Sequence, residues 1–190
     1  EYQEKKSNSI FVKFKIKNKK DNLFKDAIIA IWTTTPWTLP GNRAIAFSDA
    51  FDYVIVSFDK DYKNINFKKD EKLIFSALLF KKFCNDHEVD SYTILKEFKG
   101  KELDNIICEH PFFSIGYDYD VPLLKGEHVT NETGTGFVHI APGHGIEDFE
   151  LGKKFNIKIP NTVNPKGIYF ESVPTFSGVH IFKADKLIID

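Results

Sequence analysis

The apolar run AIIAIWT at residues 27–33 places the strongest constraint on the fold of this chain. It has the length of a β-strand and stays apolar until Thr33, which indicates a strand buried on both faces. Pro36 removes a backbone donor and favours an extended conformation at Thr35, so the strand is expected to end there. The run therefore predicts a strand without a solvent-facing side.

Other stretches have the pattern of strands separated by turns. In residues 9–17, SIFVKFKIK, branched and aromatic side chains alternate with lysines, as in a half-buried strand. Residues 52–58 and 92–98 predict further strands. Residues 110–124 predict short strands or loops, and residues 134–145 a short apolar strand between glycine turns. Turns are expected at 17–22 and at Pro40-Gly41.

Helices are expected at residues 73–87, where Leu79 and Phe83 lie four apart, and at 146–155. The acidic first turn of the second segment suits the positive end of a helix. Residues 179–190 predict a strand that runs into the start of a helix. The pattern favours a mainly β, α+β fold, in which a β-barrel carries peripheral helices. With 190 residues and no repeat or linker, we expect one domain, 1–190.

Composition narrows the classes of function. The net charge of −1 argues against tight, autonomous nucleic-acid binding, although weak contact with one end of a nucleic acid held elsewhere is compatible with it. Cys84 and Cys108 have no metal-like or redox-like spacing and are expected as free thiols in a reducing, cytoplasmic compartment. No apolar run approaches a membrane span, and the first residues do not form a signal peptide. The absence of Met, including at position 1, predicts a fragment of a longer chain.

The first candidate site is the hydroxyl-rich bend WTTTPWTLPGN at residues 32–42. Its polar members are Thr33, Thr34, Thr35, Thr38 and Asn42. A threonine hydroxyl donates and accepts hydrogen bonds, but its pKa is too high for it to lose its proton and serve as a base. Such a cluster therefore orients a polar ligand rather than activating it. The alternative is structural, because threonine is a good strand residue and Thr-Pro a common strand exit.

The second candidate site is GTGFVHIAPGHGIEDFE at residues 134–150. His139 lies inside a short apolar strand, His144 lies between glycines, and Asp148 lies in the first turn of the expected helix. A fixed carboxylate beside a glycine-lined turn could bind an ammonium group. Equally, Asp148 could simply suit the helix N-terminus, an effect of about 0.3–1 kcal/mol, and His139 could be a satisfied core histidine.

A metal centre is a competing interpretation of this segment. His139, His144 and Asp148 offer three ligands, but their spacing matches no recognised metal motif and HExxH is absent. Gly134-Thr135-Gly136 lacks the GKS/T of a phosphate loop, and neither a Ser-His-Asp nor a Cys-His arrangement can be proposed. We therefore expect no metal and no cofactor in this chain.

Together the two stretches resemble one family. WTTTPWTLPGNRAIA (32–46) and GTGFVHIAPGHGIEDFELGKKF (134–155) look like the inserted editing (CP1) domain of isoleucyl-tRNA synthetase, in the bacterial form that APGHG typifies. GKELDN at 100–105, HPF at 110–112 and GVHIFKADKLII at 178–189 fit as well. Valyl and leucyl enzymes carry an arginine after the second threonine, whereas Thr35-Pro36-Trp37 is the isoleucyl version. Residues 59–90 are the least diagnostic.

The resemblance implies a proofreading hydrolase. Isoleucine and valine differ by one methylene, from which a pocket extracts only about 1–3 kcal/mol, and isoleucyl enzymes are themselves the standard example of this limit. The implied editing pocket admits valine, excludes isoleucine and hydrolyses valyl-tRNA(Ile), with valyl-adenylate as a further substrate. An activated ester needs no protein nucleophile, and a ribose hydroxyl or a bound water is expected to handle the proton transfer.

The resemblance also implies residue roles. Asp148 would bind the α-ammonium group, and Thr33–Thr35 would orient the ester, the ribose and the water. Thr38 and His139 would bound the side-chain pocket. Asn42 matches a family position that matters for editing. Trp37 is grouped with the substrate-binding positions and, like His144, has no implied role beyond shaping the site; Gly41 replaces the more usual alanine or serine.

What the chain lacks bears on its partners. It contains neither the HIGH nor the KMSKS signature and no nucleotide-binding βα unit, so we expect no aminoacylation by this fragment. A parent synthetase would use ATP and Mg²⁺ elsewhere. The expected partners are the 3′ end of tRNA(Ile) carrying valine and the rest of that synthetase, with no membrane and a monomeric state. Two alternatives stay open: a non-catalytic module that binds aminoacyl-tRNA ends, and a deacylase for another small amino acid.

Overall fold

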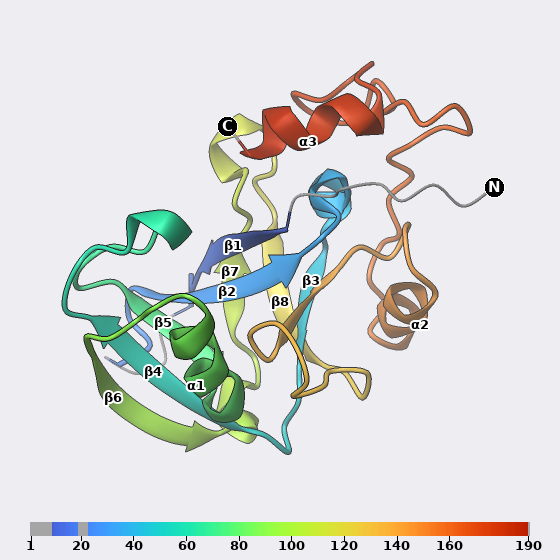
Figure 1. Ribbon diagram of the computed structural model, residues 1–190. Coiled ribbons are helices and arrows are strands. Elements are labelled where there is room, and N and C mark those ends of the chain that lie inside the picture. The colour runs from blue at the N-terminus through green and yellow to red at the C-terminus, as the bar shows by residue number, and fades with distance from the viewer. Residues whose placement is uncertain (1–8, 19–22, 190) are drawn as a thin grey trace.

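Two β-sheets flanked by helices make up the computed structural model, which describes residues 9–18 and 23–189 (Figure 1). Strands provide most of its regular structure, which confirms the mainly β fold expected from the sequence. Most of the turn expected at 17–22 lies outside the described residues. Within the described ranges, no helix has the length and hydrophobicity needed to cross a membrane.

The first sheet has the strand order β1-β2-β5-β4-β6. Its strands are β1 (Ile10–Lys15), β2 (Ala27–Thr33), β4 (Asp52–Phe58), β5 (Lys72–Ser76) and β6 (Tyr92–Lys99). β2 lies between the antiparallel β1 and the parallel β5. Ile29 and Ile31 enter one hydrophobic core. Ile28 and Ala30, which alternate with them, enter a second core on the opposite face. The predicted two-sided burial is therefore confirmed over residues 27–31, whereas Trp32, near the end of the strand, is exposed.

The second sheet has the strand order β7-β8-β3-β9. Its strands are β3 (Ala44–Phe47), β7 (Ile107–Glu109), β8 (Asp120–Lys125) and β9 (Phe137–Ile140). β3 was not predicted, since four residues containing two alanines carry little strand signal. It is nevertheless fully buried, because it pairs with β8 on one side and β9 on the other. The pairing that creates β3 comes from distant parts of the chain.

The two sheets do not close into a barrel, which corrects the sequence-based expectation. They meet at one side through a single bridge between Ile16 and Cys108. On the other side β6 and β9 are sheet edges within the described chain. The loop before β9 contacts the first sheet irregularly: Ser76 N–H donates to Thr135 O (2.8 Å), and Thr135 Oγ1 donates to Ala30 O (2.5 Å). A side-chain contact of this kind replaces the strand ladder that closure requires.

Three α-helices pack outside the sheets: α1 (Ala77–Asp86), α2 (Ile146–Lys154) and α3 (Ile181–Ile189). The expected helix at 73–87 is wrong over its first four residues, because Leu73 and Phe75 face one core and Ile74 the other in strand β5. The strand expected before α3 is reduced to one bridge between Ile168 and His180. Short 3₁₀ segments are η1 (Pro36–Gly41), η2 (Lys63–Ile65), η3 (Gly100–Leu103) and η4 (Phe113–Ile115).

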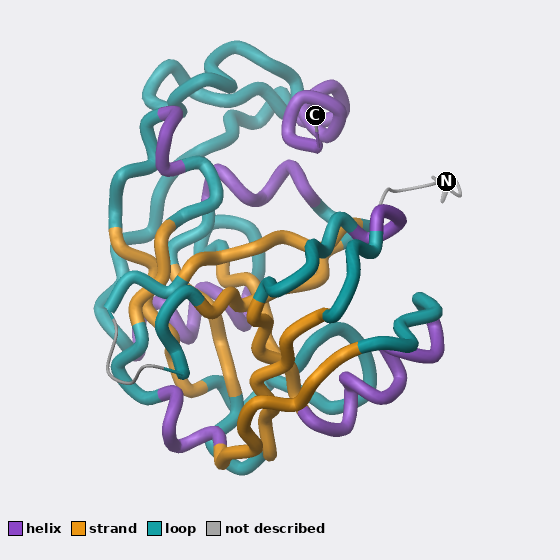
Figure 2. The backbone as a smooth tube through the Cα atoms, turned by 90° about the vertical axis from the view of Figure 1, so that its left-hand side faces the viewer, coloured by secondary structure: helices purple, strands orange, loops and turns teal. Residues whose placement is uncertain are grey.

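The three helices cover different parts of the sheets, and α3 lies at one end of the strands (Figure 1). Figures 1 and 2 show α3 and the neighbouring loops at the end of the strands where η1 emerges. α2 follows β9 and packs through Leu151 against β3 and β9, at the right of Figure 1. Cys84 and Cys108 are buried free thiols, as predicted, and burial raises the pKa of the Cys84 thiol to about 11.

Candidate active site

The threonine run begins at the last residue of β2. Thr33 is buried, whereas Thr34 and Thr35 are exposed. Thr35 N–H donates to Thr33 Oγ1 (3.1 Å), and the hydroxyl oxygens of these two threonines lie 3.3 Å apart. This local hydrogen bond turns the chain out of the sheet. Pro36 then starts η1, where its fixed φ and missing donor cost nothing.

A directed chain of hydrogen bonds joins η1 to β9. Asn42 Nδ2 donates to His139 Nδ1 (2.7 Å) and also to Ala44 O (3.0 Å). The carbonyl of Ala44 requires a donor, which fixes the orientation of the Asn42 amide. His139 Nδ1 is therefore an acceptor, and the proton lies on Nε2, which contacts Thr38 Oγ1 at 2.9 Å. Thr38 in turn donates to Thr35 O (2.9 Å).

His139 is consequently neutral and fully engaged. Burial lowers its pKa from 6.5 to about 3, with smaller contributions from His110 and His144. Both ring nitrogens are used within the protein, so the imidazole has no free position for a metal or a proton transfer. Among the described residues, no group of three His, Cys, Asp or Glu side chains is arranged to hold a metal ion. His139 can shape a wall, but it is poorly suited to act as a base.

Asp148 reaches back from α2 to the end of β9. Its Oδ2 accepts a hydrogen bond from Ala141 N–H (2.8 Å), so the carboxylate is anchored to the strand exit as well as lying in the first helical turn. The side chain is half-buried, and burial raises the pKa of its carboxyl group above the ordinary value. Such a group gains most when a cation comes close, because the cation offsets the cost of burying its charge.

These elements enclose one pocket of about 230 Å³. Six of the residues predicted from sequence line it: Thr33, Thr34, Thr35, Thr38, His139 and Asp148. Trp32, Val138, Ala141 and His144 complete the wall. Asn42 does not line the pocket and acts behind it through His139. The two sequence motifs thus meet in space, although they lie far apart along the chain.

Trp37 is also absent from the pocket lining. It packs against the hydrophobic cluster under α3, and its carbonyl accepts a hydrogen bond from the Tyr169 hydroxyl. Its ring meets that of His144 edge-on, with the centroids 5.0 Å apart. His144 Nε2 lies 2.6 Å from Thr162 Oγ1. A Cβ on Gly41 would come within 3.0 Å of the His144 ring, which gives this glycine a packing reason.

Sequence analysis missed several residues that hold the site. Arg43 contacts the carbonyls of Pro40 and Asn42 at the end of η1 and the hydroxyl of Tyr119. It is the single arginine of the sequence and follows Asn42 directly, a signal that could have found it. His110 contacts Leu39 O through Nε2 (3.2 Å), and burial lowers its pKa to about 3. Trp32 borders the threonines in the motif itself.

The chain is similar in sequence to a described family and to individual proteins. The profile of the family described as "Leucyl-tRNA synthetase, editing domain" matches residues 5–177. The chain is 42% identical over 192 residues to an isoleucine–tRNA ligase of Pelagibacter ubique and 40% identical over 190 residues to that of Syntrophomonas wolfei. Both alignments cover 100% of this chain but only 21% and 19% of the relatives. The chain therefore spans about a fifth of their length.

Solved structures share the fold. The crystal structure of GlLeuRS-CP1 matches with a TM-score of 0.70 at 13% identity, covering 96% of this chain and 94% of that one. The editing domain of the P. knowlesi cytosolic leucyl-tRNA synthetase matches with a TM-score of 0.64 at 15% identity, covering 96% and 92%. At such identities the likeness concerns the fold alone. The chain belongs to the leucyl-tRNA synthetase editing-domain family, in the version that isoleucine–tRNA ligases carry.

Proposed function

We propose that this chain hydrolyses the ester that joins valine to tRNA(Ile), as the proofreading site of an isoleucyl-tRNA synthetase. One observation carries the proposal: a single pocket gathers a half-buried carboxylate, a run of threonine hydroxyls and a neutral histidine. No strong nucleophile is present among the described residues that line that pocket, which suits a substrate that is already an activated ester.

Asp148 supplies recognition of the amino group in this proposal. One carboxylate oxygen is held by Ala141 N–H, and the other is available to the ligand. An α-ammonium group placed there gains a charge-assisted hydrogen bond, which is about twice as strong as a neutral one. The same contact anchors the ester carbonyl at a fixed distance from the helix, because only two bonds separate it from the amino nitrogen.

The threonine run supplies orientation of the ester and the attacking water. Thr33 and Thr35 are tied to each other, so their hydroxyls have fixed positions. The exposed Thr34 hydroxyl has no protein partner within the described chain and lines the same pocket. It is therefore free to hold water or ribose. Holding the reactants in place means that their translational and rotational entropy is lost on binding, so this loss no longer adds to the barrier of the reaction.

Thr38 and His139 supply the size limit. The Thr38 hydroxyl is held by Thr35 and His139, and the His139 ring is held by Asn42, so neither side chain can rotate away to admit a larger ligand. A rigid wall is what a size filter requires, since a pocket that relaxes loses the penalty for one extra methylene. Valine would fit, and isoleucine would meet the wall.

The proposal also concerns the longer synthetase of which this chain would be a part. Because the chain spans about a fifth of its relatives, a parent synthetase would supply ATP, Mg²⁺ and most of the tRNA contact, and would work as a monomer in the cytoplasm. The low net charge of this chain agrees with tRNA affinity residing elsewhere. Valyl-adenylate would present the same amino group and carbonyl to Asp148 and the threonines.

The test is hydrolysis of valyl-tRNA(Ile) and isoleucyl-tRNA(Ile) by the 190-residue chain, each measured against spontaneous hydrolysis. We expect the valyl ester to be cleaved at least about tenfold faster, the lower end of what one methylene allows. Equal cleavage of both esters would remove the size filter. Binding without cleavage would identify a non-catalytic module, and preference for another small aminoacyl ester would reassign the substrate.

A further inference from the structure

The pocket is smaller than its proposed substrate. Its volume of about 230 Å³ lies below the ~300–1,000 Å³ typical of pockets that enclose a small organic ligand. An amino acid and part of a ribose fill such a space. The inference that follows rests on the proposed function, in which the acylated nucleoside is the end of an RNA strand. The preceding nucleotide must then lie on the surface beyond the rim.

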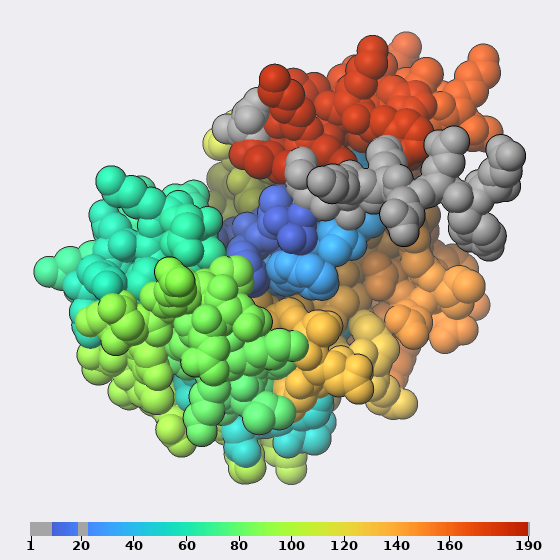
Figure 3. All heavy atoms as spheres, viewed as in Figure 1, coloured from blue at the N-terminus to red at the C-terminus, as the bar shows by residue number. Residues whose placement is uncertain are grey.

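Trp32 marks one way out of the pocket. Its side chain is 38% exposed and lines the pocket, a second hollow of about 210 Å³ and a third of about 630 Å³. Phe11 and His87 line both outer hollows with it, and their two rings meet edge-on with centroids 5.3 Å apart. We call Phe11, Trp32 and His87 the aromatic strip. In Figure 3 the blue surface of β1 and β2 is recessed between the green surface of α1 and the orange loop before β9.

Cationic side chains outnumber acidic ones around this strip. Lys82 lines the smaller hollow, and its ammonium group donates to the backbone carbonyl of Glu132 (3.3 Å), its one polar contact within the described part of the chain. Lys13 and Lys63 line the larger hollow, although Lys13 is paired with Glu71. Asp86 is the acid that lines the smaller hollow. Aromatic faces beside cations are the pattern that binds single-stranded nucleic acid without reading its sequence.

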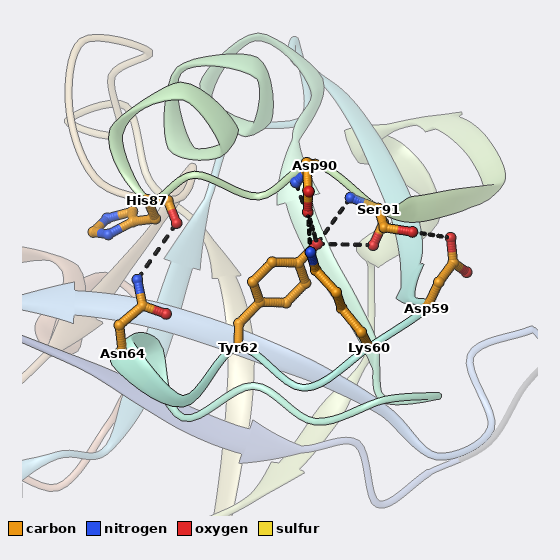
Figure 4. Close-up of polar contacts among 7 residues, drawn as sticks. All are labelled: Asp59, Lys60, Tyr62, Asn64, His87, Asp90 and Ser91. Atoms are coloured by element: carbon orange, nitrogen blue, oxygen red, sulfur yellow. Dashed lines mark hydrogen bonds and ion pairs between the residues drawn. The ribbon is translucent and has the colours of Figure 1, made fainter.

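The wall of the strip is held in place by a polar cluster (Figure 4). The Tyr62 hydroxyl accepts hydrogen bonds from Asp90 N–H (3.2 Å) and Ser91 N–H (2.8 Å) and donates to Asp90 Oδ1 (2.9 Å). Asn64 Nδ2 donates to His87 O (3.4 Å). Tyr62, just before η2, and Asn64, within η2, are thereby tied to the loop that follows α1, so His87 is positioned before any ligand arrives.

A second way out passes His144, and it is less suited to RNA. The hollow there is lined by Ile146, Phe149, Glu150 and Lys153, with Lys153 Nζ 5.6 Å from the Phe149 ring centroid. Its described lining offers two aromatic or imidazole rings, those of His144 and Phe149, and its one acid and one lysine balance. Among the described residues, the two hollows on the Trp32 side are lined by five aromatic or imidazole rings, those of Phe11, Trp32, Phe83, His87 and Phe112, and by more lysines than acids.

We propose that the aromatic strip binds the nucleotide that precedes the aminoacylated one, with its base against Trp32 and Phe11 and its phosphate near Lys82. Trp32 then separates two subsites: the aminoacyl nucleoside on the pocket side and the next nucleotide on the outer side. The strip needs no sequence preference, because every base presents a π face.

The experiment measures how much affinity one added nucleotide contributes. The first ligand is adenosine carrying valine through a non-hydrolysable 3′-amide, and the second is the same compound extended by a 5′ cytidylate. Binding of both to the 190-residue chain is measured by calorimetry at several salt concentrations. In the wild type the extended ligand should bind about 5- to 150-fold more tightly, which is the range measured for one stacked base.

Three variants locate the gain. Trp32→Ala should abolish it, and Lys82→Gln should reduce it and make the salt slope shallower by about 0.7, the value for one phosphate contact on a single strand. Lys153→Gln, the matched change at the other exit, should leave both unchanged. Because the gain is a ratio of two affinities, a general loss of pocket affinity in Trp32→Ala does not imitate the expected result.

Two outcomes overturn the inference and are distinguishable. If the nucleoside binds but extension adds nothing, or if Lys153→Gln removes the gain and Lys82→Gln does not, the strand does not follow the aromatic strip and the proposed function stands. If the wild type binds neither ligand at millimolar concentration, the proposed function falls and the inference falls with it.

Discussion

Nδ2 of Asn42 lies 2.7 Å from Nδ1 of His139, so a residue outside the pocket determines the state of one that lines it. The contact places the histidine proton on Nε2, next to the Thr38 hydroxyl. That hydroxyl must then donate to Thr35 O, at the bend where β2 enters η1. A buried amide thereby fixes the orientation of the polar groups on one wall of the pocket.

Replacing Asn42 with Ala should cost about 1–3 kcal/mol of unfolding free energy, because it leaves His139 Nδ1 and Ala44 O buried without their donor. Urea denaturation at pH 7.5 measures this. The matched control is Asn64→Ala, whose exposed amide makes one long hydrogen bond and should change stability by less than about 0.5 kcal/mol. Equal effects of the two substitutions would contradict a stabilising role for the buried hydrogen bonds of Asn42.

Asp148→Asn should lower kcat/KM for valyl-tRNA(Ile) hydrolysis by about 10- to 150-fold, which corresponds to ~1.5–3 kcal/mol for a hydrogen bond to a charged group. The fold should not suffer, because the amide oxygen can still accept from Ala141 N–H. The raised pKa of Asp148 means that its ionisation destabilises the folded state as pH rises. The variant should therefore be at least as stable as the wild type at pH 7.

The control for Asp148 is Glu150→Gln on the same helix, which lines the neighbouring hollow instead of the pocket. It should leave hydrolysis within about twofold, as expected for a surface substitution that changes energies by less than ~0.5 kcal/mol. Deacylation rates and thermal melts of both variants provide the comparison. Loss of activity in both would point to a general charge effect along α2.

The free energy of unfolding should decrease as pH falls, because two histidines are buried in their neutral form. Burial holds the pKa of His110 and that of His139 at about 3, below the ordinary 6.5, so the folded state binds fewer protons than the unfolded state between these values. Their contribution is complete above pH 6.5 and is lost as pH falls towards 3. Each histidine should contribute a slope of about 1.4 kcal/mol per pH unit.

His110→Gln tests that slope without touching a pocket-lining residue. The unfolding free energies of the wild type and the variant, measured in urea from pH 7.5 to 4.5, should converge as pH falls below 6.5. The variant loses a contact with Leu39 O and starts less stable. Parallel curves would mean that His110 is not held neutral in the folded state.

Gly136→Ala should destabilise the junction between the loop before β9 and the first sheet. Gly136 has φ +86, and an added Cβ would lie 2.4 Å from Ser76 Cβ. Left-handed strain and steric overlap should together cost about 2–5 kcal/mol. Gly178→Ala is the matched control: its φ is +73 but nothing lies within 4 Å, so only the strain of about 1 kcal/mol remains. Thermal denaturation of the two variants separates the two causes.

Local patterns determined several elements from the sequence alone. The run at β2 is apolar at every position that enters a core, and α2 begins at Ile146 as its acidic first turn indicated. The threonine motif and the His139–Asp148 segment were identified as candidate sites because hydroxyl, imidazole and carboxylate groups are recognisable wherever they lie. Their roles in editing stay predictions that the experiments above would test.

Tertiary structure decided the rest. β3 exists because β8 and β9 pair with it, and residues 73–76 are a strand because β2 and β4 lie on either side. The open arrangement of the two sheets depends on a loop contact that no period in the sequence encodes. In each case the deciding interaction joins residues far apart along the chain, where local propensity carries no information.

The pocket, too, depends partly on local sequence and partly on tertiary structure. The sequence determined which chemical groups are present, since each motif is contiguous. Only the fold decided that Asn42 lies behind the wall, that Trp37 packs away from the pocket and that Trp32 borders it. The protonation state of His139 depends on an amide 97 residues away and on burial by two sheets. Hydrogen-bond direction and burial are properties of the packed structure, because neither exists until distant segments exclude water from the same site.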